Sequence, residues 1–403
     1  MAKRVVLAYS GGLDTSVAVR WMQEEWGVDV VALAADVGQL REPEYEALAE
    51  RARSAGAVEA RVVDLRDELA ADYFVPALRA NALYEGKYPL VSALSRPVIA
   101  KHLVAAAREL DADAVAHGCT GKGNDQVRFE VSVRALAPDL EVLAPVRSWG
   151  FSRADAVDYA RRFELPLTVT KEKLYSIDEN LVGRTVECGE LEDPWVVPPS
   201  DVYTMTRPVS EAPTEPREVV VRFERGVPVA VDELDLPVHL VLSELNHIVG
   251  DYGFGRIDMV ENRRVGIKSR EIYECPGALA LMMAHADLES ITLERDLMRE
   301  KSRLEPRYAE LVYDGLWFSP LREALDGFVE VSQRDVTGEV RLSIEPGRCF
   351  VSGRRAQHGL YDYGLATYDE ADRFRHGDAE GFVRVWGLSL ETWARRYGRS
   401  GAS

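Results

Sequence analysis

The segment Ser10–Ser16, which reads Ser-Gly-Gly-Leu-Asp-Thr-Ser, combines the residue types that binding a phosphate group requires. Its paired glycines let the backbone turn sharply and approach an anion without a Cβ atom in the way. Its hydroxyl side chains can donate hydrogen bonds to phosphate oxygens. Asp14 adds a hard oxygen ligand of the kind that Mg²⁺ prefers beside bound phosphates. A lone Gly-Gly pair is more often a plain turn before a helix, so the neighbouring elements decide between the two interpretations.

Those neighbouring elements favour phosphate binding. The apolar run Arg4–Tyr9 predicts a buried parallel strand. Leu13–Trp26 predicts a helix whose N-terminus directs free N–H groups at the loop. Parallel sheets present ligand-binding loops at this place, after the carboxyl ends of their strands. The loop differs from both G-x-x-x-x-G-K-S/T and G-x-G-x-x-G. It resembles instead the PP-loop of the N-type ATP pyrophosphatases, which adenylate a substrate oxygen and release pyrophosphate.

A second polar segment, His117–Glu130, also follows a predicted strand and precedes a predicted helix. It holds glycines at 118, 121 and 123, which are costly in backbone entropy and rarely needed together in a purely structural loop. Polar side chains crowd the same stretch: Thr120, Lys122, Asn124, Asp125, Gln126 and Arg128. Because both loops follow strands of one parallel sheet, we expect them to lie at the same edge and to form a ligand site together.

The second segment resembles the signature of the argininosuccinate synthase family. Other blocks agree with that family in order along the chain: Ala8–Ser16, Ala35–Gln39, Tyr88–Pro97, Ser176–Leu181, Gly255–Arg263 and Lys268–Pro276. Weaker similarity continues through Ala309–Gly315, so the resemblance covers nearly the whole chain. It implies the reaction citrulline + aspartate + ATP → argininosuccinate + AMP + pyrophosphate, through citrullyl-AMP, in arginine biosynthesis. ATP is then a substrate, with Mg²⁺ as its companion ion.

The resemblance also implies the residues of the site. ATP would be held by Ala8, Tyr9, Ser10, Gly11, Gly12, Leu13, Asp14, Thr15, Ser16, Ala35 and Gly118. Aspartate would be held by Thr120, Asn124 and Asp125, and citrulline by Tyr88, Ser92, Asn124, Arg128, Ser176, Thr185, Glu261 and Tyr273. Thr185 stands where a serine is common in the family, and it keeps the hydroxyl group. Taken alone, Glu261 and Tyr273 would be an ordinary carboxylate and a core aromatic.

The chemistry assigns catalytic roles to Asp14, Lys122, Asp125 and Arg128. Lys122 would neutralise charge on the departing pyrophosphate. Arg128 is suited to a bidentate grip on a substrate carboxylate. Glu261 would pair with the α-ammonium of citrulline. By position alone, Asp125 is a hypothetical acceptor of the proton that the aspartate amine must lose. Asp36 is interpreted as a ribose or Mg²⁺ contact or, almost equally well, as a solvent-facing carboxylate.

The elements that must position these residues alternate between strand and helix through the first 170 residues, which predicts a parallel sheet with helices on both faces. The predicted strands are Arg4–Tyr9, Asp29–Ala35, Ala60–Val63, Ala114–His117 and Glu141–Ala144, and the predicted helices are Leu13–Trp26, one from Pro43 to Gly56, and Arg96–Leu110.

After Thr170 the pattern changes, which predicts an α+β domain. Its predicted strands are Trp195–Val197, Val219–Phe223, Val227–Val231, Phe328–Val331, Val340–Ile344 and Cys349–Ser352, and its predicted helices are His239–Val249 and Ala278–Leu304. Leu388–Tyr397 predicts a short amphipathic helix that docks on another surface. With the family resemblance, we expect an α/β fold with three parts: a Rossmann-like PP-loop nucleotide domain (1–170), a synthetase and multimerisation domain (171–375), and a C-terminal oligomerisation helix (376–403).

Composition narrows the class of protein further. The net charge of −18 argues against a general nucleic-acid surface. None of the four cysteines forms a CxxC pair, which argues against a zinc or redox motif and suits a reducing compartment. No apolar run approaches the roughly 20 residues of a membrane span. We therefore expect a cytoplasmic protein with small-molecule substrates and no membrane or nucleic-acid partner, with no protein-held metal site, and, by resemblance, a homotetramer.

Two other interpretations remain open at this stage. The first is a tRNA-modifying PP-loop ligase or thiolase, against which the acidic charge and the missing CxxC pairs count. The second is a nucleotide-binding regulator that has lost catalysis, against which the complete set of substrate-side residues counts. A glutamine amidotransferase would need a nucleophilic cysteine in a glutaminase region, and no cysteine of this chain stands in such a context.

Overall fold

The computed structural model describes residues 4–40, 44–165 and 175–398. The described residues up to His358 form one compact unit, and those from Gly359 form a second. The opening of a helix at Pro43 and the domain boundary between residues 170 and 171 lie outside the described residues. Among the described residues, no helix is both long enough and apolar enough to cross a membrane.

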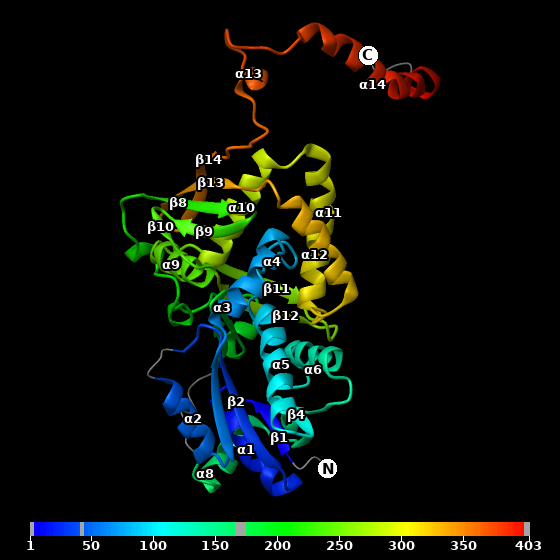
Figure 1. Ribbon diagram of the computed structural model, residues 1–403. Helices are drawn as coiled ribbons and strands as arrows, with labels where there is room; N and C mark the ends of the chain where they lie inside the picture. Colours follow the sequence, from blue (N-terminus) through cyan, green and yellow to red (C-terminus); the bar gives the residue numbers. More distant parts are fainter. Residues whose placement is uncertain (1–3, 41–43, 166–174, 399–403) are drawn as a thin grey trace. The chain divides into compact units, whose positions relative to one another are not determined.

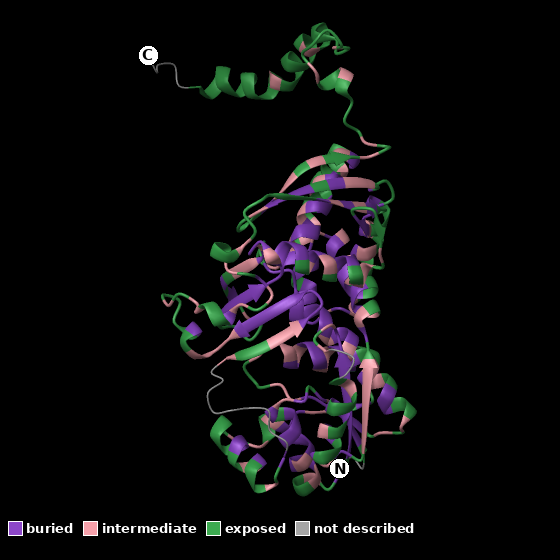
Figure 2. Cartoon of the chain, turned by 90° about the vertical axis from the view of Figure 1, so that its left-hand side faces the viewer, coloured by how far each residue is buried: buried purple, intermediate pink, exposed green. Residues whose placement is uncertain are grey.

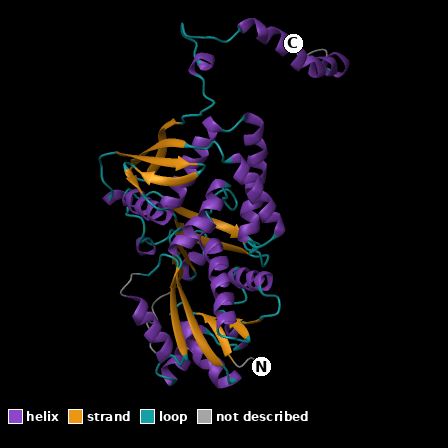
Figure 3. Cartoon of the chain, in the orientation of Figure 1, coloured by secondary structure: helices purple, strands orange, loops and turns teal. Residues whose placement is uncertain are grey.

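The N-terminal part of the first unit is built on a parallel sheet, as predicted (Figures 1 and 3). Its strands are β1 (Arg4–Ala8), β2 (Asp29–Asp36), β3 (Glu59–Asp64), β4 (Ala114–Ala116) and β5 (Glu141–Leu143). Their order is β3-β2-β1-β4-β5, and every neighbouring pair is parallel. β1 and β4, the strands that precede the two predicted ligand loops, are neighbours, so these loops begin at adjacent points of one sheet edge.

Helices cover both faces of this sheet because successive strand side chains point to opposite sides. Val5 and Leu7 of β1 pack into a cluster with α1 (Leu13–Trp26), α2 (Glu44–Ser54) and α8 (Arg153–Arg162). Val6, between them, packs into the opposite cluster with α5 (Val91–Glu109) and α6 (Asp125–Leu136). Burial of each such side chain contributes about 1.5–3 kcal/mol. The two-sided burial explains why β1 and β2 read as continuous apolar runs.

Two antiparallel sheets follow in the same unit. The first has the order β11-β12-β7-β6, from β6 (Ser176–Asn180), β7 (Gly183–Glu187), β11 (Arg256–Asn262) and β12 (Lys268–Glu274). The second has the order β10-β9-β8-β13-β14, from β8 (Arg217–Glu224), β9 (Val227–Val231), β10 (Leu234–Asp235), β13 (Gly338–Glu345) and β14 (Arg348–Arg355). This part is therefore α+β, as expected.

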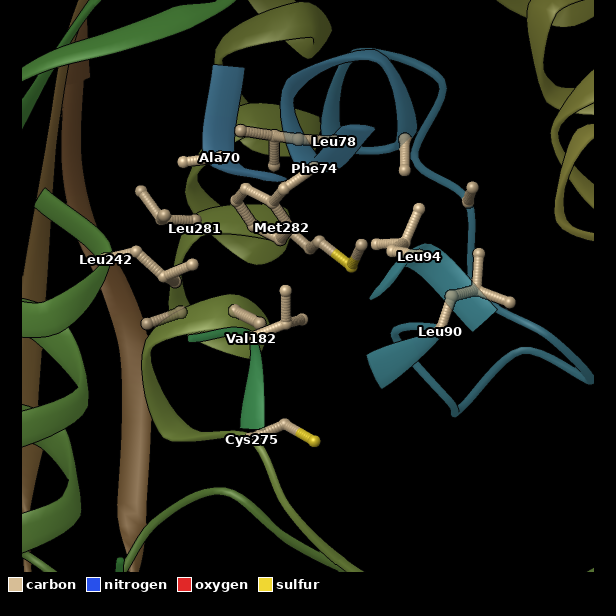
Figure 4. Close-up of a cluster of buried hydrophobic side chains, with 14 of the residues drawn as sticks. Ala70, Phe74, Leu78, Leu90, Leu94, Val182, Leu242, Cys275, Leu281 and Met282 are labelled. Atoms are coloured by element: carbon tan, nitrogen blue, oxygen red, sulfur yellow. The ribbon is translucent and has the colours of Figure 1, made fainter. Parts of the chain in front are cut away.

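The largest hydrophobic core joins these sheets to helices from both halves of the unit. The helices are the π-helix η1 (Leu69–Phe74), α4 (Val75–Arg79), α9 (Val238–Asp251), α10 (Pro276–Thr292), α11 (Arg295–Tyr313) and α12 (Pro320–Ser332). Figure 4 shows Phe74, Leu78 and Leu94 beside Leu281 and Met282 of α10. The core thus packs the start of α5, which follows Tyr88, against α10 and the other helices of the second half.

The remaining elements of this unit are short. They are α3 (Arg66–Glu68), α7 (Pro145–Ser148), η2 (Gly189–Glu192), η3 (Ser200–Val202) and η4 (Val209–Glu211).

Three predicted elements are wrong. Trp195–Val197 is no strand, because Trp195 and Val197 are solvent-exposed between prolines 194, 198 and 199. Phe328–Val331 lies inside helix α12, whose Leu325 and Val329 are buried four residues apart on one face.

The predicted long helix Ala278–Leu304 is two helices. Leu293 and Glu294 are extended, and the Glu294 carboxylate accepts hydrogen bonds from the backbone N–H groups of Asp296 and Leu297, which starts α11 afresh. Strands β6, β7, β11 and β12 were not predicted.

The second unit contains α13 (Tyr363–Ala366) and α14 (His376–Tyr397). The predicted helix Leu388–Tyr397 is the second half of α14, whose side chains are almost all exposed, as Figure 2 shows. Exposed apolar side chains follow its whole length, among them Phe382, Trp386, Leu390 and Trp393. A helix with this much exposed apolar surface is typical of one that docks on a partner.

Candidate active site

The loop after β1 is held in a tight curve by its own side chains. The Tyr9 hydroxyl lies 3.0 Å from Ser16 Oγ, and Ser10 Oγ lies 3.1 Å from Thr15 Oγ1. Gly11 has φ +75°, and a Cβ atom there would lie 2.4 Å from Leu48 Cδ1, so glycine is needed at this position. α1 begins directly after Gly12 and points its N-terminus at the loop. The geometry fits the anion-binding loop that the residue types predict.

A pocket of about 380 Å³ opens beside this loop. Of the residues predicted for ATP, it is lined by Ala8, Tyr9, Ser10, Thr15, Ala35 and Gly118. Leu33, Val37, Ile99 and Phe129 add apolar walls that sequence reasoning missed, together with Gln39, Arg96, Cys119 and Ile177–Glu179. The combination of apolar walls and a hydroxyl-lined end suits a flat ring that carries an anionic chain. Leu13 and Ser16 are buried in α1, and Ser16 is bonded to Tyr9.

The interpretation of Asp36 as a solvent-facing carboxylate is wrong, and its contact with ribose or Mg²⁺ stays a prediction. Its side chain is fully buried and does not line the pocket. It accepts hydrogen bonds from the Gly38 N–H at 2.8 Å and from the Tyr45 hydroxyl. Asp36 therefore shapes the turn after β2, where Val37 and Gln39 line the pocket beside Ala35 of β2.

A second pocket, of about 390 Å³, brings together the residues that were predicted for the two amino acids, together with Asp14, which was predicted for ATP. The residues predicted for the amino acids are Tyr88, Ser92, Thr120, Asn124, Asp125, Arg128, Ser176, Thr185, Glu261 and Tyr273. With Asp14, they come from the starts of α1, α5 and α6, from the segments that precede α5 and α6, and from the four-stranded antiparallel sheet. Ser10, Arg96, Gly118, Cys119, Ile177 and Asp178 line both pockets, so the two pockets adjoin. Lys122 is exposed and is not among the lining residues of either pocket, so its role stays a prediction.

Asp125 is held between two guanidinium groups at the floor of the second pocket. Arg96 Nε donates to its Oδ2 at 2.9 Å, and Arg128 Nη1 donates to its Oδ1 at 2.7 Å. Burial alone would raise the pKa of Asp125, but the charges of Arg96 and then Arg128 outweigh burial and lower it to about 2. A carboxylate that is so weakly basic is a poor proton acceptor at neutral pH, which disfavours the hypothesis that Asp125 is the general base.

Arg128 has one guanidinium nitrogen left for a ligand. Its Nε donates to the Tyr313 carbonyl at 3.0 Å and its Nη1 is bonded to Asp125, whereas the buried Nη2 has no partner among the described residues. A buried donor without a partner is costly, and a substrate oxygen would satisfy it. Because Nη1 also keeps a second N–H, the bidentate grip that the residue type predicts needs no existing bond to break, and it stays a prediction.

Glu261 lines the same pocket, and both of its carboxylate oxygens accept hydrogen bonds. Tyr273 donates to Oε2 at 2.7 Å and Tyr313 donates to Oε1 at 2.6 Å. Tyr88 stacks on Tyr273 with ring centroids 4.2 Å apart, so these aromatic rings form one wall. Burial raises the pKa of Glu261, while the two tyrosine hydroxyls lower it. The carboxylate keeps further lone pairs for an ammonium donor.

Ser92 and Asp178 connect the two pockets. Ser92 Oγ donates to Asp178 Oδ2 at 2.6 Å, and Arg96 Nη2 donates to the same oxygen at 2.7 Å. Thr185, opposite Asp178 in the β6–β7 pairing, places its hydroxyl 3.4 Å from the Asp178 carbonyl. Arg96 and Asp178 stand inside blocks that resemble the family, yet sequence reasoning assigned them no role because charge pairing between distant segments cannot be read from spacing.

Glu187, Arg263 and Glu271 form a charged cluster beside Glu261 that sequence reasoning also missed. All three line the pocket, and Arg263 Nη2 donates to both carboxylates. Burial, followed by the charges of Glu187 and Glu261, raises the pKa of Glu271 to about 8. Three carboxyl groups, those of Glu187, Glu261 and Glu271, surround the Arg263 cation in this part of the pocket. This part of the pocket therefore favours a cationic group of the ligand.

The raised pKa makes Glu271 a source of pH-dependent instability. Between the ordinary glutamate pKa of about 4.3 and the folded value, the folded chain keeps a proton that the unfolded chain releases, so Glu271 disfavours folding increasingly as the pH rises to about 8. We expect Glu271→Gln to raise the melting temperature at pH 8.5 and to change it little near pH 4.5. Exposed Glu300 on α11 serves as a control, with Glu300→Gln expected to show no such trend. A melting-temperature difference for Glu271→Gln that is constant across this range would contradict the prediction.

Comparisons with known proteins agree with this geometry. A model of the arginosuccinate synthase N-terminal HUP domain matches residues 4–166, and one of the arginosuccinate synthase C-terminal domain matches residues 175–393. An argininosuccinate synthase from Gloeobacter violaceus is 54% identical over 395 residues, covering 98% of this chain and 99% of the relative. One from Trichodesmium erythraeum is 50% identical over 396 residues, covering 98% of each chain.

A solved structure of a U34-tRNA thiolase from Methanococcus maripaludis aligns over 42% of this chain and 59% of that chain, at 17% identity and a TM-score of 0.28, which is too low to bear on the fold. The family models span nearly all of the described residues, and the two relatives match almost from end to end. The chain therefore belongs to the argininosuccinate synthase family.

Proposed function

We propose that the two adjoining pockets carry out the ligation of L-citrulline and L-aspartate, with ATP beside Ala8–Ser16 and both amino acids in the pocket of Arg128 and Glu261. The chain is an ATP-dependent carbon–nitrogen ligase that forms argininosuccinate, AMP and pyrophosphate in arginine biosynthesis. The placement of the substrates rests on the wall that the two pockets share. Ser10, Gly118 and Asp178 line both pockets, so a nucleotide in one pocket and an amino acid in the other would meet there.

The reaction needs alignment more than covalent help from the protein. The ureido oxygen of citrulline attacks the α-phosphorus of ATP and pyrophosphate leaves; the aspartate amine then attacks the ureido carbon and AMP leaves. A urea carbon is a poor electrophile, and adenylation turns its oxygen into part of a leaving group. Holding reactants in line can supply about 7–11 kcal/mol of the barrier in favourable cases. The rigid strand ends around the junction are suited to that task.

Recognition of citrulline would use both ends of its pocket. The unpaired Arg128 Nη2 would bind the carboxylate, and Glu261 would accept from the α-ammonium, with the wall of Tyr88 and Tyr273 along the aliphatic chain. Ser92, Ser176 and Thr185 add hydroxyl groups on the same pocket. Aspartate would be held by Thr120, Asn124 and Asp125, where Asp125 would act as a fixed acceptor for the ammonium form rather than as a base.

Mg²⁺ would accompany ATP and neutralise charge on the phosphates. Among the described residues, no group of three or more His, Cys, Asp and Glu side chains is placed to hold a metal ion. The ion would therefore take most of its ligands from phosphate oxygens and water, as Mg²⁺ commonly does, with Asp14 at the start of α1 as its carboxylate. We expect Asp14→Asn to raise the Mg²⁺ concentration needed for half-maximal activity about tenfold at saturating ATP. An unchanged Mg²⁺ dependence would remove Asp14 from this role.

The remaining assignments concern organisation. We propose that residues 1–170 are the nucleotide domain, 171–375 the synthetase and multimerisation domain and 376–403 an oligomerisation helix, in a cytoplasmic homotetramer. The exposed apolar side chains of α14 support this use of the helix. Light scattering of the full chain at micromolar concentration tests it, since a tetramer has four times the chain mass of 44.9 kDa.

The deciding assay measures pyrophosphate release from Mg-ATP with each amino acid alone, with both and with neither. We expect sustained release and argininosuccinate formation only with both substrates, and at most a burst with citrulline alone. Release that requires neither amino acid would refute the proposal. Stimulation by tRNA would favour the tRNA-modifying alternative instead.

A further inference from the structure

The end of helix α11 reaches the back of the citrulline pocket from a distant part of the chain. Tyr313, its last residue, is buried and is not among the residues that line the pocket. Its ring stacks on Tyr84 with centroids 3.5 Å apart and meets Tyr88 edge-on at 6.3 Å. No role was predicted for Tyr313, which stands in the weakest of the blocks that resemble the family.

The Tyr313 hydroxyl links two residues of the pocket. It donates to Glu261 Oε1 at 2.6 Å and accepts from Asn124 Nδ2 at 2.8 Å. Glu261 stands on β11 and Asn124 directly before α6, so one oxygen atom sets the spacing between an antiparallel strand and the nucleotide half of the unit. Asn124 Oδ1 in turn accepts from the Arg264 N–H at 2.8 Å, which closes this bridge from the other side.

The same residue also fixes Arg128. The Tyr313 carbonyl accepts from Arg128 Nε at 3.0 Å, and the Arg128 guanidinium lies over the Tyr313 ring, 4.8 Å from its centroid. Gly315, two residues on, has φ +77°, and a Cβ atom there would lie 2.8 Å from Arg128 Cα. The contact between the end of α11 and the start of α6 is therefore close. It leaves Nη2 as the Arg128 nitrogen that has no partner within residues 4–40, 44–165 and 175–398.

We infer that Tyr313 is a positioning residue for citrulline. Tyr313 holds Glu261 and Arg128 at the separation that the ammonium and carboxylate groups of citrulline require. The inference rests on the proposed roles of Glu261 and Arg128. Tyr313 would touch no substrate atom. Its hydroxyl holds the acidic end of the pocket, and its carbonyl and ring hold the basic end.

The hydroxyl also favours the ionised form of Glu261. Burial raises the pKa of Glu261, and the hydrogen bond from Tyr313 is the largest influence that lowers it, followed by the one from Tyr273. The titratable and charged groups that face Glu261 are Tyr273 and Glu271 on β12, Arg263 after β11, Arg128 on α6, Tyr313 on α11, and Tyr84 and Tyr88 before α5. Removing the hydroxyl therefore moves the ionisation of Glu261 to higher pH.

The test compares Tyr313→Phe with Tyr308→Phe, which removes the same atom from a buried tyrosine of the same helix. Tyr308 bonds Asp326 at 2.8 Å and does not line the pocket. For Tyr313→Phe we expect KM for citrulline to rise about tenfold or more, KM for ATP to stay within about twofold, and the acidic limb of the kcat/KM profile for citrulline to shift to higher pH. Tyr308→Phe should change none of these.

Several outcomes would overturn the inference. An unchanged citrulline KM or an unmoved acidic limb in Tyr313→Phe would do so, as would equal effects of the two substitutions. If Tyr313→Phe does not fold, Gly315→Ala, which pushes on Arg128 from the same turn, should raise KM for citrulline, with Gly327→Ala in open space on α12 as its control. If the wild-type chain did not use citrulline, the proposed function would be refuted. The variants could then not be compared, because there would be no KM for citrulline to measure.

Discussion

Arg96→Gln is expected to lower kcat/KM for citrulline about 100- to 1,000-fold. Arg96 lies mostly buried between Asp125 and Asp178, with 13% of its side chain exposed, and lines both pockets. Its loss leaves two carboxylates facing the junction at which we place the triphosphate. Removing one partner of a buried ion pair costs about 3–5 kcal/mol, and each 1.36 kcal/mol is a factor of ten. Steady-state kinetics with citrulline as the varied substrate measures the effect.

Two comparisons separate the chemistry of Arg96 from its contribution to stability. Arg96→Lys keeps the positive charge but cannot reach both carboxylates with a planar fork, so it should fall between wild type and Arg96→Gln. Arg270→Gln removes a buried arginine that does not line either pocket. Arg270 donates two hydrogen bonds to Asp258, with lengths of 2.9 and 2.6 Å. This substitution should lower the melting temperature and leave KM for citrulline unchanged. Equal kinetic losses in Arg270→Gln and Arg96→Gln would show that the effect is only one of stability.

Gly38→Ala is expected to weaken ATP binding and to destabilise the fold together. Gly38 has φ +107°, and a Cβ atom would lie 2.7 Å from Leu181 N, which donates to the Val37 carbonyl at 2.7 Å. The left-handed conformation costs a non-glycine residue about 1–2 kcal/mol, and crowding in a packed region adds about 1–3 kcal/mol. Since backbone atoms cannot move aside as a side-chain tip can, we expect KM for ATP to rise about tenfold and the melting temperature to fall by several degrees.

Gly86→Ala is the matched control for this substitution. Gly86 has φ +71°, and nothing lies within 4 Å of an added Cβ atom, so only the conformational cost remains. It should lower the melting temperature less than Gly38→Ala and leave KM for ATP unchanged. A KM for ATP that is equal in both variants would contradict the view that the contact between the turn after β2 and Leu181 shapes the nucleotide pocket.

The strands and helices that were predicted in the nucleotide half match the structure to within about two residues at most ends, because two-sided burial gives β1 and β2 a strong apolar pattern. Helices α4 and α8 of that half, and strands β6, β7, β11 and β12, were not predicted. The sequences of these four strands are rich in charged residues because one side of their sheet faces the pocket: Asp178, Glu187, Glu261 and Glu271 line it. Alternation of apolar and polar residues is therefore weak where the strands carry function.

The same reasoning explains which site residues were found. Ser10, Asp14 and Thr120 were predictable because a glycine-rich loop after a strand indicates an anion-binding site. Arg96 and Tyr313 were not, because their importance lies in partners 29 and 52 or more positions away along the chain. Residue type and spacing locate the groups that touch a ligand better than they locate the groups that hold those in place.

The contact between α6 and the end of α11 has a consequence for the order in which the chain acquires its two binding capacities during synthesis. Arg128 and Tyr313 are 185 positions apart. At about 5–20 residues per second, a ribosome needs about 9–37 s to add that length. Every strand of the parallel sheet has been made by Leu143, so the nascent chain can form its nucleotide loop early. The proposed citrulline site, by contrast, stays incomplete until the last turn of α11 has left the ribosome.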